Sequence, residues 1–335
     1  MYNKTELRDK NVFVTGADGF IGSHLVERLV EHGAKVSALV YYNSWNNVGW
    51  LSDIPTQTRQ KIRVISGDIR DVEFISEAVN DAEYVFHLSS LIAIPYSYSA
   101  PRSYVDTNII GTLNILQACR NNRFLRQLVH VSTSEVYGTA QSVPINENHP
   151  LVGQSPYSAS KIAADKIVES FYLSFGLPVV TARPFNTFGP RQTARAVIPT
   201  IISQLLSGKE KLKLGSLTPT RDFNFVTDTV DGMITLALCP EACGEAVNIG
   251  SGEEWSIGET AKMIQELTNR ECEIINDEER HRPEKSEVNR LLANTDKLRK
   301  LTNWKRRVSF HDGLKMTIEW TQENLHLFNP DNFAK

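Results

Sequence analysis

A glycine loop near the amino end of this 335-residue chain constrains its fold more than any other feature. An apolar run at residues 11–15 leads into glycines at positions 16, 19 and 22, and residues 23–32 have a helical pattern. Such glycines permit a tight turn and let backbone amides approach a pyrophosphate, whose charge the start of a helix favours. Residues 35–40 follow as a second apolar run. The sequence therefore predicts a strand, a phosphate-binding loop, a helix and a parallel strand.

The same alternation continues along the first half of the chain. Further apolar runs at residues 63–66, 83–88, 128–131 and 177–183 are separated by helical patterns. Alternating strands and helices predict an α/β fold, a Rossmann doubly wound parallel sheet with ligands at the carboxyl ends of its strands.

The pattern changes after residue 186. A helix at 197–207, short extended runs at 212–215 and 221–226, a return to the sheet at 247–250 and a helix at 257–267 suggest a second lobe. We expect a Rossmann domain over 1–186 plus about 226–255, and a smaller, discontinuous substrate-binding lobe over 187–225 and 256–335.

Charge and composition exclude several classes of protein. A net charge of −3, with no basic cluster beyond residues 305–307, argues against a nucleic-acid partner. No apolar run reaches the length of about 18 residues that suggests a membrane span, and the polar residues 1–10 do not resemble a signal peptide. A cytoplasmic location is therefore expected. The four cysteines are too few and too scattered for a disulfide framework or a metal site.

The end of the second predicted strand selects between nicotinamide cofactors. An acid there binds the ribose diol of NAD, whereas an arginine accepts the extra phosphate of NADP. This chain has Tyr41 and no basic residue up to position 53, which favours NAD without excluding NADP. Asp68 ends the third strand, where it can accept a hydrogen bond from adenine or, alternatively, cap a helix.

The chemistry concentrates in residues 130–161. The fifth strand leads into Ser132, Thr133, Ser134 and Glu135 at the ligand edge of the sheet. Ser155 and Pro156 predict a helix start, so Tyr157 and Lys161 share one helix face. A positive charge beside a phenol favours phenolate, which makes Tyr157 a candidate general base near neutral pH. Taken alone, such a pair is far more typical of an ordinary amphipathic helix.

Two arginines in the second lobe, Arg221 and Arg282, are candidates for binding a diphosphate. Guanidinium groups match phosphate oxygens in geometry and charge. Salt bridges on the surface are the alternative interpretation of each arginine.

Together these residues resemble the extended short-chain dehydrogenase/reductases that act on nucleotide sugars. The resemblance rests on the glycine loop, Asp68, Asn108, the pair Tyr157 and Lys161, and the arginine motifs at 183–186, 221–223 and 282–283. It implies NAD(P) in the Rossmann domain, a nucleotide sugar in the second lobe, and a homodimer in which helices at about 103–120 and 157–175 form a four-helix bundle.

The residues and the resemblance together assign three sets of site residues. The catalytic set is Thr133, Ser134, Glu135, Tyr157 and Lys161. The cofactor set is Gly16, Asp18, Gly19, Phe20, Ile21, Gly22, Tyr41, Asp68, Ile69, Leu88, Ser89, Ser90, Asn108, Ser132, Tyr157, Lys161 and Pro184. The substrate set is Tyr96, Thr133, Asn186, Arg191, Val197, Lys213, Arg221, Asn248 and Arg282.

Glu135 distinguishes this chain within the family. Members that only invert C4 typically lack an acid here, and Glu135 resembles the catalytic glutamate of the hexose 4,6-dehydratases. Ser134 replaces the aspartate usual in dTDP-glucose dehydratases and is more like the GDP-mannose enzymes. Residues 41–44, 94–98, 153–157 and 191–199 are most similar to the N-acetylglucosamine-nucleotide 4,6-dehydratases of legionaminic acid biosynthesis, which would place the product in cell-surface glycans.

The resemblance implies an oxidation followed by an elimination. Tyr157 would take the C4 hydroxyl proton, with Thr133 as a relay, while Lys161 contacts the nicotinamide ribose and keeps Tyr157 acidic. Glu135 would then remove the C5 proton. The nucleotide base, the sugar's C2 substituent and the proton donor for the C6 hydroxyl stay open.

Three other functions compete with this hypothesis. A xylose-forming nucleotide-sugar decarboxylase would need an additional arginine for the C6 carboxylate, which the sequence does not locate. A C4 epimerase needs only Tyr157, Lys161 and a roomy pocket. From a different class, the chain could be a non-catalytic nucleotide-sensing regulator, against which the intact Tyr157, Lys161 and Glu135 argue.

Overall fold

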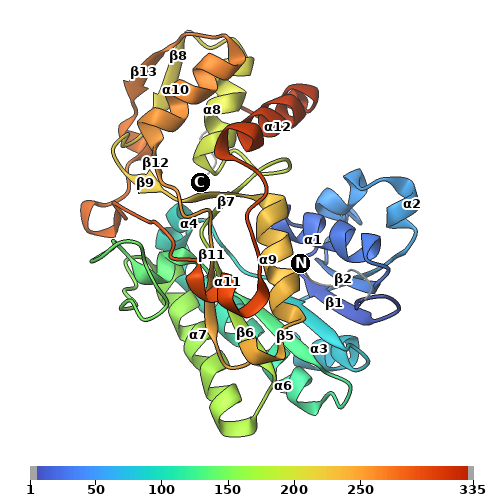
Figure 1. The fold of residues 1–335 in the computed structure, drawn as a ribbon. Coiled ribbons are helices and arrows are strands. Elements are labelled where there is room, and N and C mark those ends of the chain that lie inside the picture. The colour runs from blue at the N-terminus through green and yellow to red at the C-terminus, as the bar shows by residue number, and fades with distance from the viewer. Residues whose placement is uncertain (1–5, 331–335) are drawn as a thin grey trace.

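The computed structural model describes residues 6–330, and a seven-stranded parallel sheet forms its lower half in Figure 1. The strand order is β3-β2-β1-β4-β5-β6-β11. The order reverses between β1 and β4, and ligands bind at such a point in open parallel sheets. The predicted doubly wound fold is confirmed. The strands are β1 (Asn11–Thr15), β2 (Lys35–Tyr41), β3 (Ile62–Gly67), β4 (Tyr84–His87), β5 (Gln127–Val131), β6 (Val179–Pro184) and β11 (Ala246–Ile249).

Helices cover both faces of this sheet because its strands are apolar on both sides. In β1, Val12 and Val14 pack into one core with Leu25 of the first helix, whereas Phe13 packs into a second core with Ile115. Alternate residues of a strand point to opposite faces, which explains this division. One face carries α1 (Phe20–Glu31) and α9 (Val226–Ala237), and the other carries α3 (Val72–Val79), α6 (Gly111–Asn121) and α7 (Pro156–Phe175).

Helix α7 begins where the sequence predicts. The hydroxyl of Ser155 accepts a hydrogen bond from the Ser158 amide at 3.1 Å, and the Ser158 hydroxyl accepts one from the Ser155 amide at 3.0 Å. Pro156 occupies the first helical turn, where its missing amide hydrogen costs nothing. This reciprocal cap fixes the position of Tyr157 relative to the end of β5.

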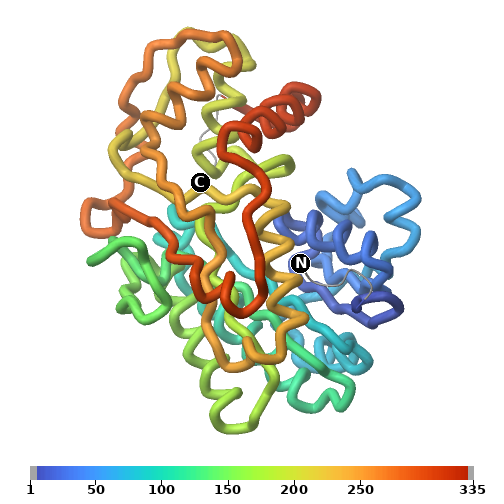
Figure 2. The backbone as a smooth tube through the Cα atoms, viewed as in Figure 1, coloured from blue at the N-terminus to red at the C-terminus, as the bar shows by residue number. Residues whose placement is uncertain are grey.

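The second lobe lies above the sheet in Figures 1 and 2. The predicted short strand at 221–226 is two strands, interrupted at Asp222, whose carboxylate accepts hydrogen bonds from the amides of Ser251, Gly252 and Ala293. The lobe contains β8 (Lys211–Leu214) paired with β13 (Glu273–Asn276), β9 (Thr220–Arg221) with β12 (Trp255–Ser256), β10 (Phe223–Phe225) with β7 (Asn186–Phe188), and helices α8 (Val197–Leu206), α10 (Ile257–Thr268) and α12 (Phe310–Glu323).

Short elements complete the chain. Helix α11 (Asp296–Thr302) lies against β11, so part of the range 256–335 returns to the sheet (Figure 1). The two-domain division stays a prediction, and its outermost residues, 1–5 and 331–335, lie outside the described part. The remaining elements are η1 (Gly49–Asp53), α2 (Thr56–Arg59), α4 (Ile94–Ser99), α5 (Pro101–Tyr104), the π-helical η2 (Val105–Ile110), η3 (Ser134–Tyr137), η4 (Pro240–Ala242), η5 (Glu278–Arg280), η6 (Glu284–Ser286) and η7 (Leu325–Leu327).

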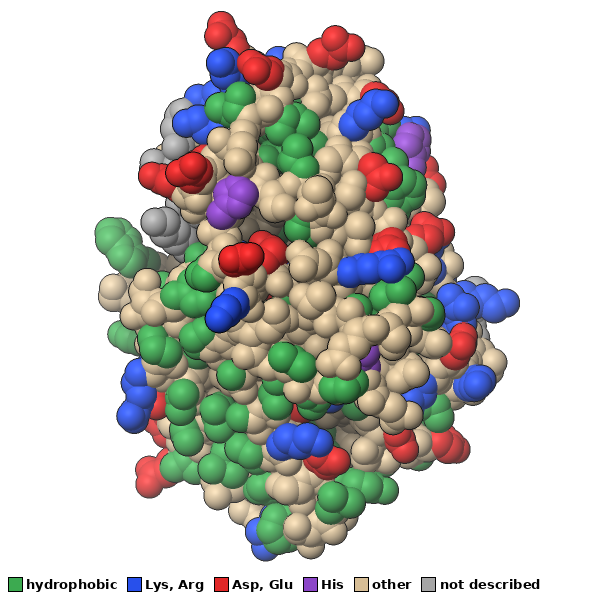
Figure 3. Space-filling model, turned by 90° about the vertical axis from the view of Figure 1, so that its left-hand side faces the viewer, with side chains coloured by type: hydrophobic (Ala, Val, Ile, Leu, Met, Phe, Trp, Pro, Cys, Tyr) green, Lys and Arg blue, Asp and Glu red, His purple; other side chains and the backbone are tan. Residues whose placement is uncertain are grey.

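Two surface features bear on partners. Within residues 6–330, every helix is too short or too polar to cross a bilayer. On the face that Figure 3 shows, hydrophobic side chains gather over the lower half, which the sheet and its helices form.

Candidate active site

The glycine loop between β1 and α1 leaves no room for side chains. A Cβ atom on Gly16, whose φ is +65°, would lie 2.9 Å from the Ser89 backbone nitrogen. A Cβ on Gly22 would lie 2.0 Å from the Gly16 carbonyl oxygen. No side chain caps α1 at Gly19, so its first-turn amides, including those of Phe20 and Ile21, remain for an anion. The loop therefore fits the pyrophosphate of a dinucleotide cofactor.

Residues at the ends of β2 and β3 flank this loop. Asp68 is held by Arg70, whose Nε lies 2.9 Å from its Oδ1, and this guanidinium holds the pKa of the carboxyl below its usual range. The alternative role of Asp68 as a helix cap is wrong, because Asp71 caps α3 through a 3.1 Å bond from the Phe74 amide. Contact of Asp68 and Tyr41 with an adenosine stays a prediction.

Asn108 organises the loop after β4. It lies in η2, and its side-chain amide donates to the Leu91 carbonyl at 3.0 Å and to the Ser160 hydroxyl at 2.9 Å. Its Oδ1 accepts the Leu91 amide at 2.8 Å. This buried side chain therefore ties the loop that holds Ser89 and Ser90 to helix α7, and π-helical turns are frequent at such functional sites.

The predicted catalytic side chains converge where β5 ends and α7 begins. The Thr133 hydroxyl accepts the Glu135 amide at 3.2 Å and interacts with the Tyr157 phenol, whose pKa it lowers. Lys161 is 3% exposed, and its ammonium donates to the Val131 carbonyl at 2.7 Å. Tyr104, which the sequence-based prediction missed, packs edge-on against Tyr157 with ring centroids 6.2 Å apart.

Burial dominates the protonation of these groups. It raises the pKa of the Tyr157 phenol well above its usual value, while the Thr133 hydrogen bond lowers it and Glu135 raises it further. Burial also lowers the pKa of Lys161 to about 8. Desolvation therefore opposes the phenolate form of Tyr157 in the protein alone, and its action as a base near neutral pH beside Lys161 stays a prediction.

Arg221 and Arg282 come together beside Glu135. Arg221 is 6% exposed, which rules out a surface salt bridge, and it donates to the Thr220 carbonyl at 2.9 Å and to Glu287 at 3.4 Å. Arg282 Nη1 lies 3.8 Å from Glu135 Oε2 and 3.9 Å from Glu287 Oε1. The Nη1 atom of Arg282 is buried and has no hydrogen-bond partner among residues 6–330. A donor held in this way suits an anionic ligand.

Glu287 is a site residue that the sequence-based prediction missed. Its carboxylate faces both arginines. The only signal in the sequence is its position five residues after Arg282, in a segment that also contains Glu284. Spacing alone does not tell which of these two acids turns inward.

Asn186 and Tyr96 remain candidates for the substrate. Asn186 Oδ1 is buried without a partner in the described structure, next to the end of β6. Tyr96 is half exposed, and its ring centroid is 6.2 Å from that of Tyr104. Val197 begins α8, and the Lys213 side chain is exposed on β8, so their assignments stay predictions.

Two other predicted substrate residues have structural partners instead. Asn248 is fully buried, its Oδ1 accepts the Tyr137 hydroxyl at 2.7 Å and its amide donates to the Ile145 carbonyl. Protein groups therefore hold its side chain, and its assignment to the substrate stays a prediction. Arg191 is paired with Glu27 of α1 and therefore lies near the glycine loop, apart from the other arginines. Its assignment stays a prediction.

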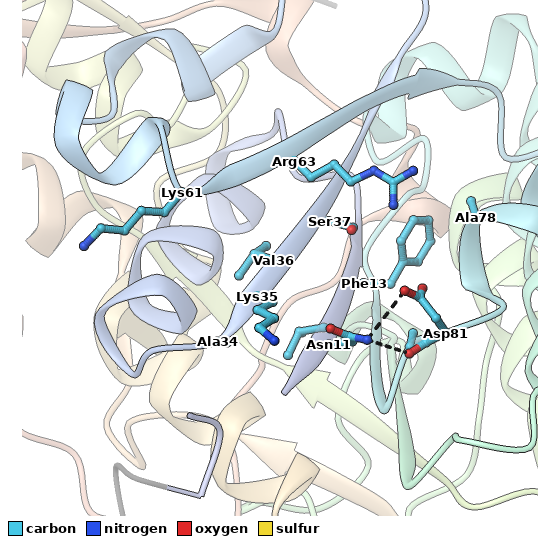
Figure 4. A pocket seen from close by; sticks show the side chains of 12 residues that line it. Asn11, Phe13, Ala34, Lys35, Val36, Ser37, Lys61, Arg63, Ala78 and Asp81 are labelled. Carbon is cyan, nitrogen blue, oxygen red and sulfur yellow. Dashed lines mark hydrogen bonds between the residues drawn. The ribbon is translucent and has the colours of Figure 1, made fainter. Parts of the chain in front are cut away.

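Two hollows lie away from these residues. One of about 320 Å³ is lined by the amino ends of β1 and β2, where Asn11 donates to the Asp81 carbonyl at 3.2 Å (Figure 4). The other, of about 640 Å³, lies beside α7 and β6 and has Asp165 and Arg183 in its wall. Neither contains a predicted catalytic residue, so the chemistry is assigned to the carboxyl edge of the sheet.

Comparison with known proteins agrees with this geometry. The family model of GDP-mannose 4,6 dehydratase matches residues 13–317. A human dTDP-D-glucose 4,6-dehydratase is 32% identical over 329 residues, covering 95% of this chain and 91% of that protein. A UDP-N-acetyl-alpha-D-glucosaminuronate decarboxylase of Bacillus cytotoxicus is also 32% identical, covering 94% and 98%. The structure of the dTDP-glucose 4,6-dehydratase DesIV from Streptomyces venezuelae, solved with NAD bound, has a TM-score of 0.84 at 27% identity and covers 96% of this chain and 99% of that one. The chain therefore belongs to the GDP-mannose 4,6-dehydratase family, within the extended short-chain dehydrogenase/reductases that act on nucleotide sugars.

Proposed function

We propose that this protein is an NAD-dependent 4,6-dehydratase in legionaminic acid biosynthesis. Its substrate would be N-acetylglucosamine linked to a nucleotide, either UDP or GDP. The observation that carries the dehydratase assignment is the placement of Glu135. Thr133 connects its amide to the Tyr157 hydroxyl, so a carboxylate stands beside the base for an alcohol. An epimerase has no use for this second base, whereas an elimination requires one.

Gly16, Gly19 and Gly22 would hold NAD, which would supply a hydride acceptor for C4 of the sugar, a hydride donor for C6 and, in its oxidised form, a positive charge. Its selection over NADP is supported by Arg70, whose guanidinium is engaged by Asp68 rather than left for a 2′-phosphate.

The protein's own residues supply the proton transfers. Tyr157 accepts the proton of the C4 hydroxyl, and the hydrogen-bonded Thr133 hydroxyl can pass that proton on. Oxidation at C4 makes the C5 hydrogen acidic, so Glu135 removes it as a proton and the C6 hydroxyl departs as water. When the hydride returns to C6, C5 takes up a proton from solvent through Glu135, which balances the proton that Tyr157 took from the C4 hydroxyl. Ser134 is buried and carries no carboxyl, so we assign the proton donor for the leaving hydroxyl to Glu135 as well.

The two arginines would hold the nucleotide's diphosphate. Arg221 and Arg282 converge from separate segments of the second lobe, and Arg282 has a buried nitrogen without a hydrogen bond to any described residue. Guanidinium groups bind phosphate oxygens through two parallel hydrogen bonds, which orients the ligand as well as attracting it. The sugar would then extend toward Tyr157 and Glu135.

One observation favours a second candidate, a nucleotide-sugar decarboxylase. Arg282 Nη1 lies 3.8 Å from Glu135, so an arginine stands where a C6 carboxylate would need one. The similarity to the Bacillus cytotoxicus decarboxylase supports the same reading.

Product mass separates the candidates. The purified protein with NAD is incubated separately with UDP-GlcNAc, GDP-GlcNAc and UDP-N-acetylglucosaminuronate, and the products are analysed by mass spectrometry and NMR. We expect loss of one water from an N-acetylglucosamine nucleotide, and none with the Tyr157→Phe variant. Loss of carbon dioxide from the uronate would establish the decarboxylase, and an isomer of unchanged mass would establish an epimerase. NAD binding without turnover on any nucleotide sugar would point to a regulator.

We also propose a homodimer formed through η2, α6 and α7. This proposal is supported by exposed apolar side chains, Val105 and Ile110 on η2 and Leu173 and Phe175 on α7. The gathering of hydrophobic side chains on the lower half of one face is consistent with it (Figure 3). Light scattering of the wild type and of an Ile110→Glu variant tests the mass. The cytoplasmic location remains a prediction from the sequence.

A further inference from the structure

A buried group of charged residues lies directly behind the catalytic lysine. Asp165 follows Lys161 by one turn of α7, on the same face of the helix. Its Oδ2 lies 3.1 Å from Nε and 3.0 Å from Nη2 of Arg183 in β6, and its Oδ1 lies 3.3 Å from Nε2 of His130 in β5. All three residues are at most 5% exposed.

The two histidines of this region carry no charge at neutral pH. His87 in β4 is held between the hydroxyls of Thr15 and Thr112 at 2.9 and 3.0 Å, and its ring lies 5.6 Å from that of His130. Burial lowers the pKa of both rings, and the charge of Lys161 lowers them further. Both histidines are therefore neutral neighbours of Lys161.

Asp165 remains ionised in this setting. Burial alone would raise the pKa of its carboxyl, but the contacts with His130 and Arg183 outweigh burial and hold the pKa below its usual value. Arg183 is always charged. One carboxylate thus faces two cations, Arg183 at contact distance and Lys161 one helical turn away.

We propose that Asp165 is a positioning residue, whose carboxylate is the countercharge that keeps Lys161 an ammonium and so sets the electrostatic environment of Tyr157. The inference rests on the role of Lys161 in the proposed function. Among residues 6–330, the Lys161 ammonium has a single hydrogen bond, to the neutral Val131 carbonyl, so no other contact in this part of the chain compensates its charge.

The charge of Asp165 matters because the pKa of Lys161 lies close to physiological pH. Burial lowers the pKa of Lys161 to about 8, and Asp165 acts in the opposite direction. Two other charged groups lie near this region: the charge of Arg183, like that of Lys161, lowers the pKa of His130, and the charge of Glu135 raises the pKa of Tyr157. Because the value is close to physiological pH, loss of the Asp165 charge would leave much of Lys161 neutral under working conditions.

A purely structural ion pair between α7 and β6 is the competing explanation, and charge-changing variants distinguish the two. Asp165→Asn and Arg183→Gln break the same pair and should cost similar stability. Their effects on Lys161 are opposite in sign, because one removes its countercharge and the other removes a competing cation.

The first readout is the alkaline limb of kcat/KM against pH. We expect Asp165→Asn to shift this limb to lower pH by about 1 pH unit, the low end of the effect of an opposite charge near a titrating group. Arg183→Gln should shift the limb to higher pH. The double variant should return close to the wild type, and Asp165→Glu should restore most of the shift. Movement of both single variants in the same direction, or an unmoved limb with lowered stability, would overturn the proposal.

The second readout needs no turnover. The pKa of Lys161 is lowered to about 8 in the folded protein from 10.5, so the unfolded chain binds more protons between these values and stability rises with pH across the window. The difference in urea unfolding free energy between each protein and its Lys161→Met counterpart isolates this rise. It should begin at lower pH in Asp165→Asn and at higher pH in Arg183→Gln.

The two readouts separate the failure of this inference from the failure of the proposed function. A protein inactive on every nucleotide sugar would still show the displaced unfolding windows if Asp165 holds the Lys161 charge. If dehydration is normal and the pH range over which stability rises does not move in the variants, the role of Asp165 is refuted and the proposed function is not. If Asp165→Asn does not fold, the upward shift expected for Arg183→Gln remains decisive.

Discussion

Replacement of Glu135 by glutamine should separate chemistry from folding more cleanly than any other change. Glutamine has the same size, and the backbone bond from residue 135 to the Thr133 hydroxyl at 3.2 Å does not depend on the side chain. The lost ion pair with Arg282 spans 3.8 Å, with the two side chains 12% and 26% exposed. A partly solvated pair of this kind contributes at most about 1 kcal/mol to stability.

The cost to catalysis should be several times larger. A general acid or base contributes roughly 10²- to 10⁴-fold in rate, which corresponds to about 2.7 to 5.4 kcal/mol at the barrier. Amide oxygen is too weak a base to remove a proton from C5, and the amide has no acidic proton to give the leaving hydroxyl. We therefore expect kcat to fall by at least ~10²-fold while KM changes little.

The assay combines steady-state kinetics, urea unfolding and solvent deuterium incorporation at C5 of the product. Glu287→Gln is the matched control, because Glu287 lies 3.9 Å from the same arginine nitrogen but has no proposed chemical step. It should raise KM and leave kcat within a few fold. Turnover by Glu135→Gln near the wild-type rate would refute the elimination assigned to this carboxylate. If the free energy of unfolding fell by as much as the activation free energy rose, the loss of activity would be attributed to folding.

Three further predictions test the surroundings of the site. Gly22→Ala should abolish measurable NAD binding by calorimetry, because its Cβ would lie 2.0 Å from the Gly16 carbonyl oxygen. Tyr137→Phe removes the hydroxyl that bonds Asn248 and Arg183 and should lower the free energy of unfolding by about 2 kcal/mol in urea titrations. Burial lowers the pKa of His24 from 6.5 to about 4, so stability should fall as pH drops through this window, by up to about 3 kcal/mol. His24→Gln should remove this acid sensitivity in parallel titrations; an unchanged profile would contradict the assignment.

The sheet could be predicted because its signals are local. Each strand is an apolar run, and the glycines at 16 and 22 are required by contacts within one strand–loop–helix unit. The prediction of one strand over 221–226 was wrong, because Asp222 turns into the protein to bind amides that are 29, 30 and 71 residues away. No local pattern reports such distant partners.

The site residues divide in the same way. Ser155 caps its own helix, so the sequence could place Tyr157 and Lys161 on one face. The hydrogen bond that holds the Asn248 side chain could not be predicted, because its partner Tyr137 lies 111 residues earlier in the chain. Glu287 was missed because its carboxylate acquires a role only where two arginines from separate segments meet.

The sequence by itself determined the parallel sheet, the glycine loop and the candidate catalytic side chains, since these depend on periodicity and on short spacings. Only the tertiary structure decided their electrostatics. It buried Tyr157 deeply enough to raise its pKa, placed Arg282 within 3.8 Å of Glu135, and set Asp165 between Arg183 and Lys161. Desolvation and charge pairing depend on what surrounds a group in space, and the surrounding groups can be distant in the chain, as are Glu135 and Arg282, whose numbers differ by 147 (282 − 135).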